Sequence, residues 1–406
     1  MRGYWVAIPT YWTYAGGAGP EEIVFDHPTP VDSAGTLRRT LESLIPLAAQ
    51  GAEAAVVAAA TAPALEAAVE ARVREVLASP RLPYPVRLCA ASHLSRLRDF
   101  CRAHGRQEWL PLLSLGGYSQ IRNLTLVLAN LGGARMLISL DDDEVIAAPD
   151  FLATVEADVT ELAREHPVFG LAGVYRHADG GVLLPEPEVA WAAAWPKMRW
   201  LNAALTDLVL TGPRLKPTPL GFGGNLALPA ALFRRIPFDP ALTRGEDTDY
   251  ILNARMFGIP FFLDNTLNIV HLPPDKPHPT WQRLRQDLVR FCYTRQKLRQ
   301  QEPGPGRVRV SAAEFKPYPG NFLEDDLPQR AYRSHTLLAL DYLARGDAEG
   351  ARQTLENLVL MDRLENSEAG VYRDYVATVS RWQALQSWLA MPEVAAQARA
   401  ALWGTP

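Results

Sequence analysis

The chain has 406 residues, of which 48% are hydrophobic and 21% are charged. This length exceeds the size at which one hydrophobic core usually stops growing, so we expect one large domain and a smaller one. The composition excludes a disordered or fibrous protein. The formal net charge of -4 provides no general attraction to nucleic acid or anionic lipid, so no nucleic-acid partner is expected.

The cysteines and the N-terminus indicate a compartment. Three cysteines cannot all pair within the chain, and none of them forms a Cys-X-X-Cys motif, so a reducing compartment is predicted. The apolar stretch at residues 4–9 is too short for a signal peptide, and no later run is long enough to cross a membrane. We therefore expect a cytoplasmic protein without a transmembrane segment, with peripheral membrane contact left open.

Apolar runs alternate with helical patterns through the first two-thirds of the chain, which is typical of an α/β protein with a largely parallel sheet. The expected strands cover residues 4–8, 54–60, 86–90, 136–140 and 168–174. The expected helices cover residues 37–48, 64–78, 93–104 and 118–131. A long loop, residues 11–35, is expected after the first strand, and a loop of this length is more often functional or mobile than inert.

The last third of the sequence reads differently. Prolines at 272–279 are expected to interrupt regular structure before a helix at 281–300. The pattern predicts three parts: a sheet domain at 1–280, a helix with a Pro/Gly-rich linker at 281–322, and a helical region at 323–406. Residues 331–360 resemble one tetratricopeptide-like hairpin, although a plain helical cap is favoured because solenoids need several repeats.

Four consecutive acidic residues follow the apolar strand expected at 136–140: Asp141, Asp142, Asp143 and Glu144. Burying that strand would crowd these carboxylates at its carboxyl end, where they repel each other and resist desolvation. A hard divalent cation would neutralise them, and oxygen ligands suit Mg or Mn. The pattern predicts a metal site, with a solvated acidic turn as the alternative.

Four further features fall at suitable places around this acidic segment. Arg122 lies in the helix before it and could bind phosphate or pair with an acid. The glycine-rich segment 221–225 ends a possible strand, and its glycines would let a ligand approach the backbone closely. Glu246 and Asp247 open a helix whose N-terminus favours negative charge, and His271 follows a short apolar run.

Together these features resemble the GT-A type glycosyltransferases, especially the inverting family 2 enzymes, over residues 8–271. The matching segments are Ile8-Pro9-Thr10-Tyr11, Arg122-Asn123, the DxD-like Asp141-Asp142-Asp143, Gly223-Gly224, the pair Glu246-Asp247, and His271. The resemblance implies a GT-A (Rossmann-like) fold with a mixed, mostly parallel sheet and covering helices. The loop 11–35 departs from the family pattern, at the outer wall of the expected donor pocket.

The resemblance also implies a reaction. A hexosyl group passes from a nucleotide-diphosphate sugar, with UDP-sugar expected ahead of GDP-mannose, to a hydroxyl of a small-molecule, glycan or lipid-linked acceptor, with inversion. A Mn or Mg cofactor would stabilise the departing diphosphate as a Lewis acid. A carboxylate base would take the proton of the acceptor hydroxyl.

Roles for individual residues follow from the same resemblance. The expected metal ligands are Asp143 and His271. The expected donor-binding residues are Pro9, Thr10, Tyr11, Arg122, Asp141 and Asp142. Asp247 is the expected catalytic base, with Glu246 as its competitor. The expected acceptor-binding residues are Gly223, Gly224, Asn225, Trp191 and Trp195, near the cations Lys197 and Arg199.

Plainer interpretations stay open for several of these residues. His271 could be structural, the pair Glu246-Asp247 could be ordinary first-turn acids, and Trp191 and Trp195 share a spacing that also fits core packing. A retaining enzyme on the same scaffold is the nearest alternative function. A nucleotidyltransferase lacks support because no Gly-rich, basic phosphate loop follows the first strand. A non-catalytic sugar-binding or scaffold protein, or a homo-oligomer formed through the C-terminal helices, also remains open.

Overall fold

A mixed sheet organises the chain in the computed structural model, which describes residues 3–17, 25–78, 81–274 and 278–404. Its strands are β1 (Tyr4–Thr13), β2 (Thr29–Pro30), β3 (Glu53–Ala60), β4 (Val86–Cys89), β5 (Met136–Ser139), β6 (Glu144–Val145), β7 (Gly170–Arg176), β8 (Leu215–Pro217), β9 (Leu226–Pro229) and β10 (Phe261–His271). They run in the order β4-β3-β1-β5-β9-β7-β10-β6, with β2 beside β1 and β8 beside β10.

The directions of the strands bring several of their ends to one edge. β1 is parallel to β3 and β5, and β7 is parallel to β10. β9 runs antiparallel to both β5 and β7, so β5 and β7 point the same way. The carboxyl ends of β1, β3, β5, β7 and β10 therefore lie on the same side of the sheet.

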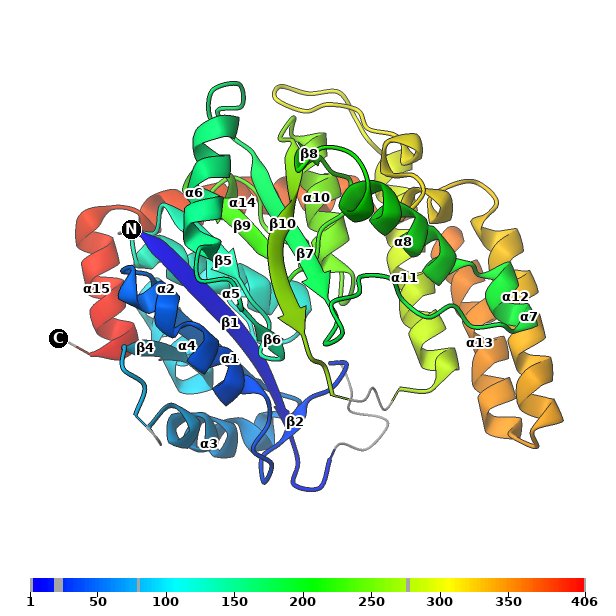
Figure 1. Cartoon of the computed structure of the whole chain (residues 1–406), viewed down its shortest axis with the longest axis horizontal. Helices are drawn as coiled ribbons and strands as arrows, with labels where there is room; N and C mark the ends of the chain where they lie inside the picture. The colour runs from blue at the N-terminus through cyan, green and yellow to red at the C-terminus, as the bar shows by residue number, and fades with distance from the viewer. Residues whose placement is uncertain (1–2, 18–24, 79–80, 275–277, 405–406) are drawn as a thin grey trace.

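Helices cover both faces of this sheet (Figure 1). They are α1 (Leu37–Ser43), α2 (Ile45–Ala49), α3 (Glu66–Ala78), α4 (Ala91–Ala103), α5 (Tyr118–Leu131), α6 (Phe151–Leu162), α7 (Ala190–Ala194), α8 (Lys197–Leu205), α9 (Ala230–Phe233), α10 (Glu246–Met256), α11 (Thr280–Arg299), α12 (Leu327–Ala344), α13 (Ala348–Glu365), α14 (Val371–Leu389) and α15 (Pro392–Trp403). All ten residues of β1 are buried because the sheet is covered on both sides.

A separate hydrophobic cluster covers each of the two faces of the sheet. Side chains of α1, α2, α3 and α6 pack in one cluster, and those of α4, α5, α10, α14 and α15 pack in the other. Alternate residues of β1 enter the two clusters, for example Trp5 and Val6, as the two-residue period of a strand requires. The predicted α/β class, with a mostly parallel sheet and a helical C-terminal region, is confirmed.

Two of the C-terminal helices, α12 and α13, lie away from the sheet, and the next two, α14 and α15, pack against it. α12 and α13 form one helical hairpin at the far end of the molecule from α15 (Figure 1). α14 and α15 then cover the sheet: Trp382 Nε1 donates to the Phe233 carbonyl at 2.9 Å, and Trp403 Nε1 donates to the Leu88 carbonyl at 2.8 Å. The domain boundaries expected at 280 and 322 stay predictions.

Three local expectations were wrong. β1 continues through Thr13, pairing with β3 as far as Trp12 and with β2 at Thr13, so the long loop starts later than residue 11. The strand beside segment 221–225 follows it as β9 instead of preceding it. The helix expected at 37–48 is split into α1 and α2, because Pro46 lacks an N–H and begins a new helix. Residues 18–24 and 275–277, parts of the long loop and the proline-rich stretch, lie outside the described residues.

Two general features complete the description. The three cysteines, Cys89, Cys101 and Cys292, are free and buried. Within the described ranges, no helix combines the length and the apolar character that crossing a bilayer requires.

Candidate functional site

The acidic segment forms a tight turn at the carboxyl end of β5. Asp142 is buried, and its carboxylate accepts a hydrogen bond from Thr10 Oγ1 of β1. Thr40 Oγ1 of α1 lies 2.8 Å from the carbonyl oxygen of Asp142 and 2.7 Å from that of Glu144, and its one hydrogen is shared between them. Burial raises the pKa of Asp142 and of Glu144 well above their usual values. The turn is therefore a buried structure, which contradicts the solvated acidic turn.

Asp143 is the meeting point of two histidines. His27 Nε2 and His271 Nε2 lie 3.4 and 3.3 Å from the same oxygen, Asp143 Oδ2. That oxygen is buried, and within the described part of the chain no group donates a well-aligned hydrogen bond to it. Burial opposes ionisation of Asp143, but the neighbouring histidines outweigh burial and hold its pKa below the usual value.

Strand pairing explains why His271 reaches this turn. β6 pairs with the end of β10 so that Glu144 lies opposite His271. One ligand atom each from Asp143, Glu144 and His271 lie within 4.8 Å of one another. Two carboxylates and an imidazole at this spacing are a suitable donor set for a divalent cation. Asp143 Oδ2 and Glu144 Oε1 are both buried without a hydrogen-bond partner among the described residues, so a cation could bind both.

Arg122 connects the acidic turn to the start of α10. Its side chain is only 3% exposed, and Nη2 lies 2.6 Å from Asp141 Oδ1. Its Nε lies 3.5 Å from Glu246 Oε1, and Nη1 donates to Ser139 Oγ at 2.9 Å. The guanidinium is charge-balanced by these carboxylates, and it orients both of them toward the same space.

Gly245 and the glycine-rich segment position the expected base. Gly245 has a φ of 73°, a left-handed conformation that favours glycine, and it turns the chain into α10. Asp247 then accepts hydrogen bonds from the backbone N–H groups of Gly223 at 3.3 Å and Thr248 at 2.7 Å. Burial, reinforced by the charge of Asp247, raises the pKa of Glu246 to about 7.

The glycine-rich segment also approaches the acidic turn. Gly224 N donates to the Tyr175 hydroxyl at 2.7 Å, and a Cβ on Gly224 would lie 2.1 Å from Glu144 Oε2. Asn225 is buried, and its amide donates to the carbonyls of Val174 at 3.2 Å and Leu267 at 3.0 Å. These bonds tie β7 to β10, so Asn225 holds the strands together at this edge.

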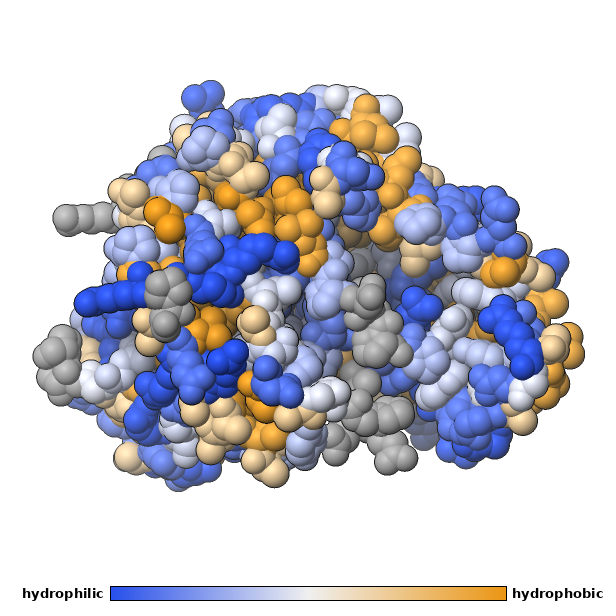
Figure 2. All heavy atoms as spheres, turned by 60° about the horizontal axis from the view of Figure 1, so that its bottom comes forward, coloured by the Kyte–Doolittle hydropathy of each residue, from blue (hydrophilic) through white to orange (hydrophobic). Residues whose placement is uncertain are grey.

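Nine of the expected residues meet in one cavity of about 310 Å³ at the carboxyl edge of the sheet, and Gly224 and Asn225 do not line it. Tyr11, Arg122, Asp141, Asp142, Asp143, Gly223, Glu246, Asp247 and His271 line it. Figure 2 views the molecule from the side that lies at the bottom of Figure 1, and a recess bordered by hydrophilic surface lies near the middle of that face. Pro9 and Thr10 lie in β1 behind the cavity, where Thr10 supports Asp142.

Several lining residues were not assigned a role from the sequence. They are Asp26, His27, Tyr118, Tyr175, Arg244, Arg290 and Tyr318. His27 had a signal, because it lies in the loop that was singled out as functional. Arg290 and Tyr318 lay beyond the expected sheet domain, and α11 and the linker bring them back to its cavity.

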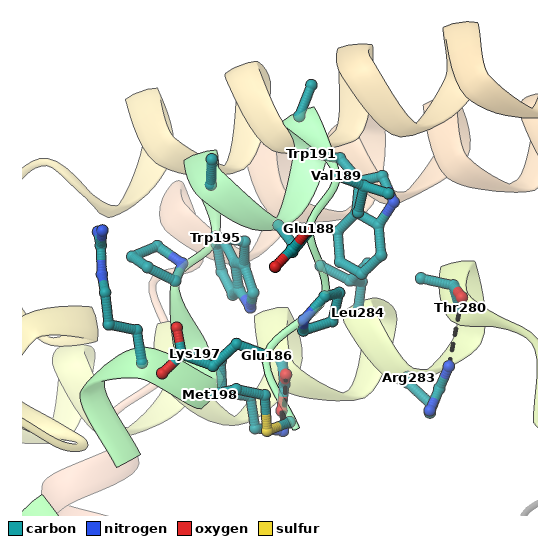
Figure 3. A pocket seen from close by; sticks show the side chains of 17 residues that line it. Glu186, Glu188, Val189, Trp191, Trp195, Lys197, Met198, Thr280, Arg283 and Leu284 are labelled. Carbon is teal, nitrogen blue, oxygen red and sulfur yellow. Dashed lines mark hydrogen bonds and ion pairs between the residues drawn. The ribbon is translucent and has the colours of Figure 1, made fainter. Parts of the chain in front are cut away.

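Trp191 and Trp195 lie in a neighbouring pocket of about 500 Å³ and not in the carboxylate-lined cavity. Figure 3 shows Trp191 on α7 and Trp195 directly after this helix, with Lys197 and Met198 at the start of α8. Trp195 is buried and its ring lies 4.6 Å from that of Phe322. Lys197 and Met198 line both spaces, so the pocket and the cavity adjoin.

Comparisons with known proteins give similarity in structure alone. No protein-family model and no curated protein sequence matches the chain. The mannosyltransferase PcManGT from Pyrobaculum calidifontis, in complex with GDP-Man and Mn2+, is 16% identical, with a TM-score of 0.45 over 97% of this chain and 88% of its own. TarS 1-349 of S. aureus is 15% identical, with a TM-score of 0.38 over 88% and 90%. GalNAc-T7 with UDP, GalNAc and Mn2+ is 15% identical, with a TM-score of 0.41 over 78% and 54%.

Proposed function

We propose that the protein is a metal-dependent glycosyltransferase that moves a sugar from a nucleotide-diphosphate donor to a hydroxyl group. The observation that carries this proposal is the convergence of Asp143, His271 and Asp247 on one cavity from three separate elements. A metal-ligand set and a separate carboxylate base are the two requirements of this transfer.

The residues at the β5 tip would receive the donor. Asp143, Glu144 and His271 would hold a Mn or Mg ion, which supplies Lewis-acid stabilisation of the charge on the leaving diphosphate. Arg122 holds Asp141 at 2.6 Å, and this carboxylate faces the cavity to bind the ribose or a water molecule. Motif resemblance favours a UDP-sugar ahead of GDP-mannose.

Asp247 would act on the acceptor. Its two oxygens each accept a backbone N–H bond, from Gly223 and Thr248, which fixes the orientation of the carboxylate. The carboxylate can accept the proton of the acceptor hydroxyl as that oxygen attacks the anomeric carbon, on the face opposite the leaving group. This geometry would invert the anomeric configuration, and NMR of the product tests it: retention would overturn the inverting assignment.

The metal-dependent step is tested with Asp143→Asn. We expect the wild-type protein to hydrolyse at least one UDP- or GDP-sugar with Mn, and the variant to lose about 100-fold of that rate, because a metal ligand is removed. Asp150→Asn, an exposed acid close by in sequence, is the matched control and should behave as wild type. Mn-dependent thermal stabilisation is the second readout. Equal activity of the two variants would overturn the metal site.

The base is tested with Asp247→Asn. The change preserves shape and removes the proton acceptor, so transfer should fall by about 10² to 10⁴-fold. Binding of the nucleoside diphosphate with Mn, measured by calorimetry, should change less than about twofold. Asp374→Asn on α14, where the acid is exposed, is the control. A parallel loss of donor affinity would show that Asp247 binds the donor.

A further inference from the structure

Besides Arg122, three cations line the cavity, and none of them belongs to a strand of the sheet. Lys197 begins α8, Arg244 precedes α10, and Arg290 lies in α11. Three segments far apart in the sequence therefore bring positive charge to one place. The mechanism above uses none of these side chains.

Two of the cations share one buried carboxylate. Lys197 Nζ lies 2.9 Å from both oxygens of Asp287, and Arg290 Nη2 lies 2.8 Å from Oδ1 of the same group. Burial would raise the pKa of Asp287, but the charges of Lys197 and Arg290 lower it to about 2, so this carboxylate is ionised. Burial lowers the pKa of Lys197 to about 8 against the attraction of Asp287, and Arg290 lowers it further. Asp287 thus pairs with both cations, and the charge of Asp247 also acts on Arg290.

The cations keep donor capacity for a ligand. Arg290 Nη2 also donates to the Tyr318 hydroxyl at 2.6 Å, and Nε donates to Asp287 at 3.0 Å. Among the described residues, Arg290 Nη1 has no hydrogen-bond acceptor, and the ammonium group of Lys197 bonds only to Asp287. Arg244, in contrast, is bound bidentately by Asp26 and donates to Gln286 Oε1 at 2.7 Å.

Arg290 lies next to the turn that carries Asp247, the expected base. A Cβ built on Gly245 would lie 2.6 Å from Arg290 Nη1, so the guanidinium contacts the turn that opens α10. Asp247 lies two residues further along this turn. A ligand group bound to Arg290 Nη1 would therefore lie beside the carboxylate that receives the acceptor proton.

We propose that the acceptor is an anion: its carboxylate or phosphate group binds to Lys197 and Arg290 while its hydroxyl faces Asp247. This inference rests on the proposed function. Carboxylate and phosphate oxygens suit these donors because charge-assisted bonds from lysine and arginine are short and strong. A neutral hydroxyl compound would leave the ammonium group of Lys197 and Nη1 of Arg290 without an anionic acceptor for the bonds that they can still donate.

The test compares acceptors that differ only in charge. Glucose, glucuronate and glucose 6-phosphate form one matched set, and glycerol with glycerol 3-phosphate forms another. With the donor that the protein hydrolyses, we expect transfer to at least one anionic member to exceed transfer to its neutral partner by about 10-fold or more. Comparing glucuronate with glucose 6-phosphate shows whether the site prefers a carboxylate or a phosphate group. Equal or preferred use of neutral partners, or no transfer to any anionic member, would overturn the proposal.

Variants assign the preference to these residues. Lys197→Met and Arg290→Gln should each reduce the ratio of anionic to neutral transfer toward about 1, and Lys197→Arg should restore it. Arg363→Gln is the matched control, because Arg363 is exposed on α13 and lines neither this cavity nor the neighbouring pocket. The ratio is internally normalised, so a general loss of activity does not change it. A ratio that survives in Lys197→Met and Arg290→Gln would contradict the assignment.

Binding measurements separate this proposal from the glycosyltransferase function itself. Without metal, inorganic phosphate should raise the melting temperature of the wild type more than chloride does at equal ionic strength, and Lys197→Met should lose this excess. We expect this phosphate effect even if the protein hydrolyses no nucleotide sugar. Absence of hydrolysis would refute the proposed function but would not refute the anion site. Weakened binding of UDP or GDP in Lys197→Met, without loss of the acceptor preference, would assign the cations to the donor phosphates and refute the proposal.

Discussion

At the scale of the residue, one arginine side chain connects the acidic turn after β5 with the acidic start of α10. Arg122 is 3% exposed and contacts both Asp141 and Glu246, which lie on β5's exit turn and on α10. Arg122 attracts both carboxylates, but for Glu246 burial and the charge of Asp247 outweigh this attraction, so its ionised form is unfavourable in the folded protein. Glu246 is the member whose charge depends on pH near neutrality.

Glu246→Gln should therefore stabilise the metal-free protein at high pH. Burial raises the pKa of Glu246 from 4.5 to about 7, so the folded state binds more protons than the unfolded state between these values. The free energy of unfolding consequently falls as pH rises through this range. We expect Glu246→Gln to gain about 1 to 3 kcal/mol at pH 8 and little at pH 4.5. Urea unfolding at both pH values measures it, with the exposed Glu368→Gln as control. A constant difference between the two pH values would contradict the assignment.

At the scale of the element, local signals predicted some pieces and tertiary contacts determined others. The helix at 118–131 has its predicted bounds because glycines flank it on both sides. The length of β1 could not be predicted, since Tyr11 and Trp12 belong to the strand only through pairing with β3. β9 follows its glycines because an antiparallel place between β5 and β7 is a property of the whole sheet.

The candidate site shows the same division. Asp143, Asp247 and His271 were identifiable because each follows a recognisable local pattern, and the structure places them at one cavity. His27 and Arg290 were not assigned because their partners lie far away in sequence. Trp191 and Trp195 lie in the adjoining pocket. Their spacing indicated a shared helix face, but it could not indicate whether that face is turned toward the carboxylate-lined cavity. Their acceptor role, like the roles of the other residues, stays a prediction.

Gly224→Ala tests the contact between the glycine-rich segment and the acidic turn. The added Cβ would lie 2.1 Å from Glu144 Oε2, so the turn must shift. We expect the free energy of unfolding to fall by about 1 to 3 kcal/mol and Mn-dependent stabilisation to weaken. Gly117→Ala is the control, because a Cβ at Gly117 would meet no atom within 4 Å and the φ of 170° there is extended. Comparable thermal shifts with Mn in both variants would contradict this coupling.

At the scale of the whole molecule, the chain end supports the sheet that carries the site. Trp382 of α14 and Leu402 of α15 belong to the same hydrophobic cluster as Trp5 of β1 and Leu137 of β5. The amide of Asn130 in α5 also donates to the Gln386 carbonyl at 2.8 Å. The last helices are therefore part of the packing beneath the sheet, and α11 connects them to the cavity wall.

Trp382→Ala should weaken the entire fold. Its side chain is fully buried, so truncation should lower the free energy of unfolding by about 3 to 5 kcal/mol. We expect urea unfolding to show one transition, with coincident far-UV and fluorescence midpoints. Tyr332→Ala, at a side chain 46% exposed on α12, is the control and should cost far less. A separate early transition that removes only helical signal would show that the C-terminal helices fold independently.

The burial of the three thiols has a practical consequence for labelling. Burial raises the pKa of Cys89 to about 12 and of Cys101 to about 11, and it raises that of Cys292 as well. The thiolate is the form that reacts with maleimides, so these three cysteines should remain unlabelled while the protein is folded. A cysteine introduced at an exposed surface position could then carry a fluorophore or spin label on an otherwise unaltered background, and distance changes on nucleotide addition could be followed directly.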